Sequence, residues 1–495
     1  MDYFAPKARD KALRINLDRT IYGSFAEIGA GQEVAANFFK AGGASGTVAK
    51  TMSAYDMKFS DAIYGLEEHG RYVSKSRLEK MLHKEFGLCK IRLSDIAAKT
   101  RFFAFANTVT TINYDRSNQG HGWMGIRFQI NPETPQNECI MHIQMHDRDA
   151  LLQQHVLGTI GVNLIYACYY HYHDSDKFLD SLVEGITKGS VEIDFLQFSG
   201  PDFEGVDNRI ISLRLVKKGL TNSTMFGAKG DVILAADRLY KKNVAILRGR
   251  FRPPTLQTLD MLKTGWKKFK VEQDVDLDHT VLVTELTLNN LLNTQDSDVD
   301  EKDFLDRVDI LCSTGQTVMI SNFQEYYKLV NYLSHITKKR KIGIILGVHN
   351  LENVFDEKYY EFLPGGILES FGRLFGNNVK LYVYPSAGGE FDEKYTCENL
   401  KIAEHLKPLL QYLLINGKIE DIKEANSEVF TIYSDDVLEM IQRNEEGWEK
   451  YMHHRVAKII KDHCLFGFQC VPLEQKNGKA NKFLNITEKS SKSDT

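Results

Sequence analysis

The chain has 495 residues, of which 43% are hydrophobic and 26% are charged, and its formal net charge is -4. This length predicts two or more domains, and the hydrophobic fraction is sufficient for a large buried core. Acidic and basic residues are interspersed along the chain. The composition therefore gives no reason to expect nucleic acid or an anionic membrane as a partner.

The N-terminal residues 1–7 have no apolar stretch of the kind found in secretory signals. The longest apolar run, residues 157–170, is shorter than a bilayer span and contains Asn163. The seven cysteines are scattered and never spaced Cys-x-x-Cys, which is typical of free, mostly buried thiols in a reducing compartment. We therefore expect a cytoplasmic protein with no membrane partner. The sequence does not indicate its oligomeric state.

The first half of the chain mixes helices with hairpin-like strands. Helices are expected over residues 33–40 and 76–86, the second with Ser76 as its cap. Apolar and polar residues alternate over residues 123–130 and again over 140–146. This pattern predicts an antiparallel hairpin with one apolar face and one polar face.

In the second half, short apolar segments alternate with amphipathic ones. Strands are expected over residues 243–247, 280–284, 317–320, 342–348 and 379–384, and helices over 256–270, 304–312, 323–336 and 400–414. Such alternation predicts a parallel sheet covered on both faces. The fold class is therefore α/β. We expect an α+β N-terminal domain over 1–240, a Rossmann-like, mostly parallel domain over 241–473, and a disordered tail over 474–495.

The strongest functional motif follows the predicted strand at 243–247. Gly249 permits close approach of the backbone to a ligand, and Arg248, Arg250 and Arg252 offer forked donors to phosphate oxygens. The N-terminus of the helix predicted at 256–270 adds N–H groups and a positive dipole end. The alternative is an arginine-rich turn whose charges are only solvated.

This segment resembles the first motif of the nicotinate- or nicotinamide-mononucleotide adenylyltransferases, Gly-x-Phe-x-Pro-x-His/Thr-x-x-His. Gly249, Phe251, Pro253 and Thr255 match it, whereas Thr258 stands where that family has its second histidine. The resemblance covers about ten residues, and the family's distal Ile-Ser-Ser-Thr-x-x-Arg motif is missing. It implies a nucleotide site whose residues are as follows: Gly249, Arg250, Phe251, Arg252, Thr255 and Thr258. Mg²⁺ would accompany ATP, and no catalytic residue is identified.

Over its whole length the chain resembles a family of uncharacterised bacterial proteins loosely called nucleotide adenylyltransferases, and sometimes outer-membrane receptors. The shared stretches are residues 24–34 and 321–328. The composition contradicts the receptor description.

Two glycine-rich stretches near the N-terminus resemble phosphate-binding loops only in part. Residues 29–34 begin like a dinucleotide fingerprint, but Val34 replaces the third glycine and no convincing strand is expected before it. Residues 42–51 end in Lys-Thr, but alanines replace the glycines of a Walker A sequence. Tight turns are the simpler interpretation, and a loop that holds an anion is the alternative.

The polar face of the predicted hairpin is a further candidate for ligand binding. His142 and His146 point the same way, and His121 and Arg127 can join them across the strands. No cysteine or carboxylate is in register with them, so we expect no metal and instead a wall for a phosphorylated ligand. The alternative is a solvated polar face.

The leading hypothesis is a nucleotide-binding protein of the nucleotidyltransferase type, whose partner is a nucleotide or another phosphorylated small molecule. The alternative is a non-catalytic binding or scaffold protein with a degenerate nucleotide-binding domain. The sequence does not identify the substrate or show whether the protein is an enzyme.

Overall fold

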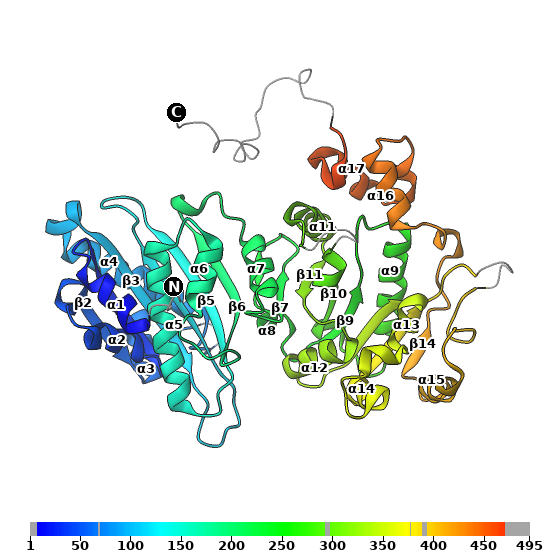
Figure 1. Ribbon diagram of the computed structural model, residues 1–495, viewed down its shortest axis with the longest axis horizontal. Coiled ribbons are helices and arrows are strands. Elements are labelled where there is room, and N and C mark those ends of the chain that lie inside the picture. Colours follow the sequence, from blue (N-terminus) through cyan, green and yellow to red (C-terminus); the bar gives the residue numbers. More distant parts are fainter. Residues whose placement is uncertain (1–6, 68–69, 293–297, 377, 389–393, 471–495) are drawn as a thin grey trace, which may run out of the picture. The chain divides into compact units, whose positions relative to one another are not determined.

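The computed structural model describes residues 7–67, 70–292, 298–376, 378–388 and 394–470 (Figure 1). The tail expected over 474–495 lies outside these residues. The chain forms two compact units, Met1–Thr221 and Asn222–Thr495. The division precedes the expected boundary at 240/241, because Ser223–Phe226 pairs with a strand of the second sheet. The α/β fold class is confirmed.

Unit 1 contains a six-stranded mixed sheet with the order β2-β1-β3-β4-β5-β6. β1, β2 and β3 are parallel to one another, and β3 to β6 pair antiparallel in succession. The strands are β1 (Ile21–Gly29), β2 (Val48–Ala54), β3 (Arg101–Thr110), β4 (Gly120–Phe128), β5 (Asn137–Met145) and β6 (Val191–Ser199). The predicted hairpin is therefore present as β4 and β5. The expectation that no strand precedes Gly29 is wrong, because β1 ends at that residue.

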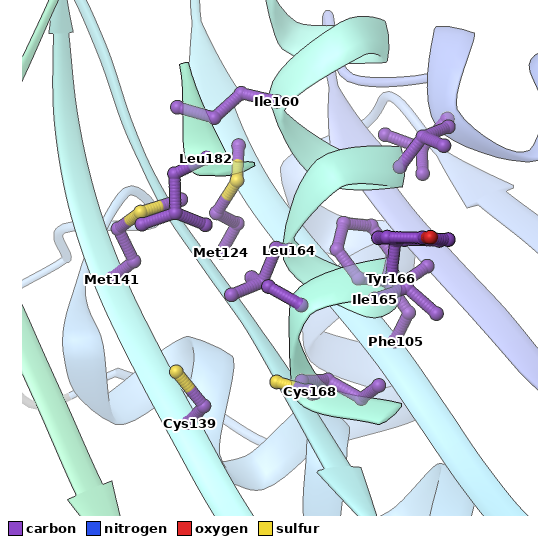
Figure 2. Packing of buried hydrophobic residues seen from close by; sticks show 14 of the residues in the cluster. Phe105, Met124, Cys139, Met141, Ile160, Leu164, Ile165, Tyr166, Cys168 and Leu182 are labelled. Atoms are coloured by element: carbon purple, nitrogen blue, oxygen red, sulfur yellow. The ribbon is translucent and has the colours of Figure 1, made fainter. Parts of the chain in front are cut away.

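The helices of unit 1 cover both faces of this sheet. They are α1 (Ala8–Leu17), α2 (Glu33–Ala41), α3 (Met57–Tyr64), α4 (Lys75–Arg92), α5 (Ala150–Tyr170), α6 (Ser175–Leu182) and α7 (Asn208–Lys217), with 3-10 turns at Ala44–Gly46, Ser94–Lys99 and Pro201–Phe203. α5 is buried along most of its length. Leu164 of α5 lies over Met124 and Met141 of the sheet (Figure 2). The apolar run seen in the sequence is thus the central helix of a core.

α4 packs on the second face of the sheet, against β3 and β4. Phe86 and Cys89 of α4 pack against Phe102 and Ala104 of β3. α4 begins at Lys75, one residue earlier than expected. Its N-cap is Ser74 rather than Ser76, because the Ser74 side chain accepts from the N–H of Arg77.

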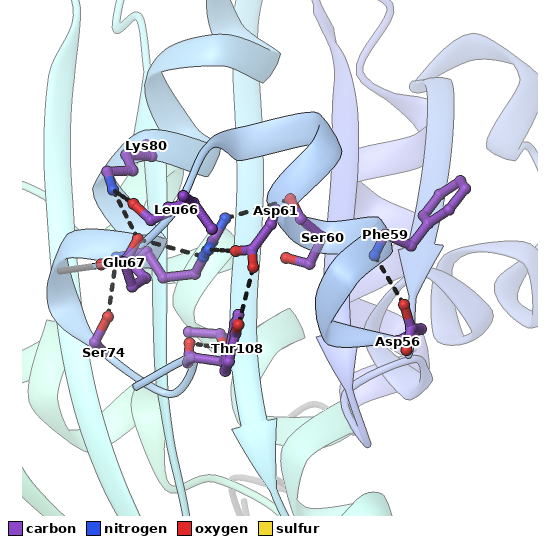
Figure 3. A network of polar contacts seen from close by, with 11 residues as sticks. Asp56, Phe59, Ser60, Asp61, Leu66, Glu67, Ser74, Lys80 and Thr108 are labelled. Carbon is purple, nitrogen blue, oxygen red and sulfur yellow. Dashed lines mark hydrogen bonds and ion pairs between the residues drawn. The ribbon is translucent and has the colours of Figure 1, made fainter. Parts of the chain in front are cut away.

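A buried ion-pair network holds the start of α4 in place. Arg77, whose side chain is fully buried, lies 2.6 Å from Asp61 and 3.4 Å from Glu67. Tyr72 donates its hydroxyl to Asp61 at 2.9 Å, and Thr108 of β3 donates to the Tyr72 carbonyl at 2.7 Å. Figure 3 shows Asp61, Glu67 and Thr108 converging on this network. Removal of Arg77 would take away the cation that Asp61 and Glu67 share, which is destabilising for buried ion pairs.

Unit 2 contains an eight-stranded sheet with the order β14-β13-β12-β9-β10-β11-β7-β8. All pairings from β14 to β11 are parallel, and β7 and β8 add an antiparallel edge. The strands are β7 (Ser223–Phe226), β8 (Val232–Ile233), β9 (Asn243–Arg248), β10 (Thr280–Thr287), β11 (Thr317–Ser321), β12 (Ile342–Gly347), β13 (Val379–Tyr384) and β14 (Ile419–Asp421). The parallel part has the doubly wound strand order of a Rossmann fold.

The helices of unit 2 follow the strands in alternation, as the sequence predicts. They are α8 (Ala235–Leu239), α9 (Leu256–Lys270), α10 (Leu288–Leu291), α11 (Glu301–Ser313), α12 (Tyr326–Thr337), α13 (Val348–Val354), α14 (Gly366–Phe375), α15 (Lys407–Ile415), α16 (Ser434–Gln442) and α17 (His454–His463). Shorter 3-10 turns lie at Leu277–His279, Glu357–Tyr360, Glu404–Leu406, Ser427–Val429, Trp448–Tyr451 and Leu465–Gly467.

The cysteines differ from the expectation in one respect. Cys464 and Cys470 form a disulfide, whereas the remaining five are free and buried. Within the described part of the chain, none of the helices combines the length and the apolar character needed to cross a bilayer.

Candidate functional site

The segment directly after β9 lies where α/β sheets usually bind ligands. β9 is the first parallel strand of unit 2, and β10 and β12 lie on its two sides. The chain path therefore reverses between β9 and β12, and ligands of open parallel sheets bind outside the carboxyl ends at such a point. Residues 249–255 and the N-terminus of α9 occupy this position.

The loop after β9 is held in one shape by hydrogen bonds from neighbouring elements. Asn290 Nδ2 donates to the Gly249 carbonyl at 3.3 Å, and Arg307 Nη1 donates to the carbonyls of Arg250 and Asn290 at 3.2 and 2.6 Å. Phe251 is 3% exposed, and a Cβ at Gly249 would lie 3.1 Å from its ring. The loop is thus held in one shape before any ligand binds, by these hydrogen bonds and by the burial of Phe251.

Two of the three predicted arginines serve this packing. Arg248 donates from Nε and Nη2 to the two carboxylate oxygens of Glu285 on β10, at 2.9 and 3.1 Å. Arg252 Nε donates to Asp303 of α11 at 2.6 Å. The arginine side chains are only 9% and 18% exposed. Bidentate or buried pairs of this kind fix geometry, so Arg248 and Arg252 hold the loop.

Arg250 has a different environment. Its side chain is 47% exposed and makes a 3.0 Å ion pair with Asp435, which is 66% exposed. Exposed ion pairs contribute only about 0–1 kcal/mol. A phosphate could replace Asp435 at little cost, so Arg250 is the member of the predicted trio best placed to meet a ligand.

Thr255 and Thr258 form the N-terminus of α9. Thr255 is the N-cap, and its N–H donates to Thr258 Oγ1 at 3.4 Å. A hydroxyl three residues into the helix satisfies a donor that the helix leaves free. Thr258, which stands in place of the histidine of the adenylyltransferase motif, therefore acts here as a helix cap.

In unit 1, the structure brings together two of the predicted histidines. His142 Nδ1 lies 2.6 Å from Asp194 Oδ1, and His142 Nε2 lies 3.2 Å from His121 Nδ1. Gln144 donates to the other Asp194 oxygen at 2.7 Å. Since the carboxylate needs a donor, His142 carries its proton on Nδ1 and accepts from His121. Burial and the adjacent His142 lower the pKa of His121 to about 4.

Arg127 and His146 do not join this cluster. Arg127 lies 3.0 Å from His83 of α4, and His146 lies 3.5 Å from Glu192 of β6. Although the hairpin residues share one face, a rise of about 3.4 Å per residue separates positions 121 and 127 by about 20 Å. The predicted four-residue wall is therefore not one site.

The two glycine-rich stretches of unit 1 lie in different surroundings. Residues 30–32 link β1 to α2, and Glu27 of β1 lies beneath this turn and accepts from the Val34 N–H at 3.2 Å and from Asn107 Nδ2 at 3.4 Å. Burial raises the pKa of Glu27 to about 8. Lys50 lies on the edge strand β2 and pairs with Glu85. Residues 42–51 thus do not form a continuous phosphate loop.

Among the described residues, no group of three or more His, Cys, Asp or Glu side chains is arranged to hold a metal ion.

No family model and no curated protein matches this chain. Solved structures similar to part of it include the competence/damage inducible protein CihA from Agrobacterium tumefaciens, at 18% identity over 34% of this chain and 98% of that chain, with a TM-score of 0.25. A competence or damage-inducible protein from Enterobacter asburiae matches at 12% identity over 33% and 98%, with a TM-score of 0.24. A competence-damaged protein (CinA) superfamily protein from Escherichia coli matches at 12% over 31% and 84%, with a TM-score of 0.22. TM-scores this low carry no conclusion about function.

Sequence reasoning missed the acidic partners of these sites. Glu285, Asp194 and Glu27 each stand inside an otherwise largely apolar strand. A charged residue in such a strand is rarely buried unless it is paired or protonated, and this was the available signal.

Proposed function

We propose that unit 2 binds a nucleotide, with its phosphates at the loop of residues 249–255 and the N-terminus of α9. The observation that carries this proposal is the position of the Gly-x-Phe-x-Pro-x-Thr segment, which directly follows the first strand at the switch point of a doubly wound sheet. The same residues carry the adenylyltransferase resemblance.

The roles of the predicted residues follow from their contacts. Arg250 supplies the positive charge, and the first turn of α9 supplies N–H groups and a positive dipole end. Gly249 and Phe251 shape the loop, and Arg252 ties it to α11. Thr255 is the N-cap residue of α9, and the Thr258 hydroxyl accepts from its N–H. The bound species is a nucleotide or another phosphorylated small molecule.

The finer proposal is nucleotidyl transfer from ATP with Mg²⁺. Such transfer requires mainly positioning of the reactants and neutralisation of phosphate charge, which a preorganised loop can provide. Release of pyrophosphate from ATP in the presence of nicotinate or nicotinamide mononucleotide is the direct assay.

The alternative, a binding or scaffold protein without catalysis, is favoured by two specific observations. Arg248 and Arg252 are neutralised by Glu285 and Asp303, and Thr258 caps a helix where the family has histidine. Nucleotide binding without pyrophosphate release would select this alternative.

The binding test is calorimetry of the full chain with MgATP at one fixed salt concentration. One charge-assisted bond to phosphate contributes about 1.5–3 kcal/mol, so Arg250→Ala should weaken binding at least about tenfold. Arg443→Ala is the matched control, because it removes another exposed, ion-paired arginine of unit 2.

Arg250→Ala should leave the fold intact, since it removes only an exposed ion pair. Unchanged affinity in this variant would reject the site. Loss of binding in Arg443→Ala to the same extent would show that the effect is one of general charge.

A further inference from the structure

A serine, a histidine and a glutamate meet at the carboxyl ends of β12 and β13, away from every residue used above. His349 lies two residues beyond the end of β12, and Ser386 lies two residues beyond the end of β13. His349 Nε2 is 3.0 Å from Ser386 Oγ, and His349 Nδ1 is 3.4 Å from Glu352 Oε2. The histidine thus lies between a hydroxyl and a carboxylate.

The Glu352 carboxylate is held by Tyr395. Tyr395, which is 8% exposed, donates its hydroxyl to Glu352 Oε1 and accepts from the Lys401 N–H at 2.8 Å. The Tyr395 ring also lies against the His349 ring, with centroids 5.2 Å apart. Backbone hydrogen bonds in both directions, at 3.1 and 3.0 Å, tie Tyr395 to Ser386. One tyrosine therefore positions all three groups.

These contacts indicate which atoms of the three side chains donate hydrogen bonds and which accept them. Glu352 can only accept when ionised, so His349 presents Nδ1–H to it, and Nε2 is left as an acceptor. The Ser386 hydroxyl has two acceptors within reach, His349 Nε2 at 3.0 Å and the Ala387 carbonyl at 3.2 Å. A nucleophile within hydrogen-bond reach of a base, with that base oriented by a third group, is the arrangement that activates serine. The His349 side chain is 68% exposed, so a substrate can reach the pair.

We propose that Ser386 is a nucleophile toward activated acyl groups such as carboxylic esters, with His349 as its base and Glu352 as a positioning residue. A bond forms between Ser386 Oγ and the carbonyl carbon while the hydroxyl proton passes to His349 Nε2. The bond to the alcohol then breaks, and the alcohol leaves with that proton. Water completes the cycle by releasing the acid and restoring the serine.

The test uses a fluorophosphonate probe on the full chain, with the labelled residue identified by peptide mass spectrometry. Ser386 Oγ would form a bond to phosphorus, fluoride would leave, and His349 would take the proton. We expect labelling of Ser386 at least tenfold faster than of Ser427, an exposed serine of the same unit. Ser386→Ala should abolish this labelling, and His349→Ala should slow it at least tenfold.

The positioning role of Glu352 has a separate readout. Glu352→Ala should slow labelling of Ser386, and Glu352→Asp should recover part of the rate because it keeps a carboxylate. Circular dichroism of each variant identifies any loss of fold. In the unaltered protein, labelling of Ser386 no faster than of Ser427 would overturn the proposal, as would an unchanged rate in a folded His349→Ala variant. Neither result depends on whether the β9 loop binds a nucleotide.

Discussion

In each unit the first strand of the parallel part of the sheet passes through a glycine-containing turn into a helix, but the N-termini of the two helices have different surroundings. In unit 1, β1 leads into α2, and β2 and β3 lie on either side of β1. In unit 2, β9 leads into α9 in the corresponding place between β10 and β12. Both positions are topological switch points.

The difference lies in what occupies the space at the strand end. In unit 1, the Glu27 carboxyl accepts from the Val34 N–H near the start of α2, where a ligand anion would otherwise bind. In unit 2, the Thr258 hydroxyl accepts from the N–H of Thr255 at the start of α9, and Arg250 reaches solvent. A strand-turn-helix sequence with glycine in the turn therefore indicates an anion site only when no carboxyl group of the protein already occupies the N-terminus of the helix, as Glu27 does in unit 1.

The largest effect on stability is expected from the ion pair between Arg248, at the end of β9, and Glu285 of β10. Glu285→Ala leaves the guanidinium of Arg248 buried without its carboxylate, which should lower the free energy of unfolding of unit 2 by about 3–5 kcal/mol. Urea unfolding followed by the fluorescence of Trp266 and Trp448 measures this. Glu439→Ala, which removes an exposed partner of Arg443, should change stability by less than about 0.5 kcal/mol. Equal effects of the two changes would contradict the described role of Glu285.

The two turns should also differ in their tolerance of a methyl group. A Cβ at Gly31 would lie 2.1 Å from Asn107 Oδ1, so Gly31→Ala must displace a buried side chain and should cost about 2–4 kcal/mol. At Gly249 the nearest atom is in the Phe251 ring at 3.1 Å, and we expect a cost of about 1 kcal/mol or less. Thermal unfolding of both variants makes the comparison, and the reverse order would show that the turns are wrongly described.

The carboxyl of Glu27 predicts a pH dependence confined to unit 1. Its pKa is about 8 in the folded state against an ordinary value of 4.5, so between these values the folded state keeps a proton that the unfolded state has lost. Stability should therefore fall as pH rises from about 4.5 to about 8, by up to about 1.4 kcal/mol per pH unit. Urea unfolding at several pH values, followed by Trp123 in a Trp266→Phe, Trp448→Phe background, measures this slope.

Glu27→Gln removes the titrating group and is the matched control for that slope. The free energy of unfolding of the variant minus that of the parent should increase with pH between about 4.5 and about 8, because only the parent loses stability. A difference that stays constant with pH would show that Glu27 is ionised in the folded state.

Much of the fold could be predicted from the sequence because both units follow simple periodicity. The segments 256–270 and 379–384 coincide with α9 and β13, where apolar spacing and strand-like residues agree with the final burial. β1 was missed because Gly23, Ser24 and Glu27 divide its apolar residues into runs too short to predict a strand. β1 is buried by α2, by α5 and by the strands on either side of it. Its local sequence does not show these tertiary contacts.

The candidate site could be predicted only in part. The position of residues 249–258 at a strand end was correct, because a short strand followed by a helix is a local property. The pairing of Arg248 with Glu285 and of Arg252 with Asp303 joins residues 37 and 51 positions apart. Such pairing depends on strand order, so the sequence could not separate the structural arginines from Arg250.

Hydrogen exchange of the full chain with and without saturating MgATP tests the central claim most directly, because it observes both switch points in one experiment. If the β9 loop binds phosphates, peptides covering residues 249–262 should exchange more slowly with MgATP, since bound N–H groups and an ordered loop exchange less. Peptides covering residues 29–41 should be unchanged, because Glu27 already occupies that helix start. Protection confined to residues 29–41, or none at residues 249–262, would contradict the account.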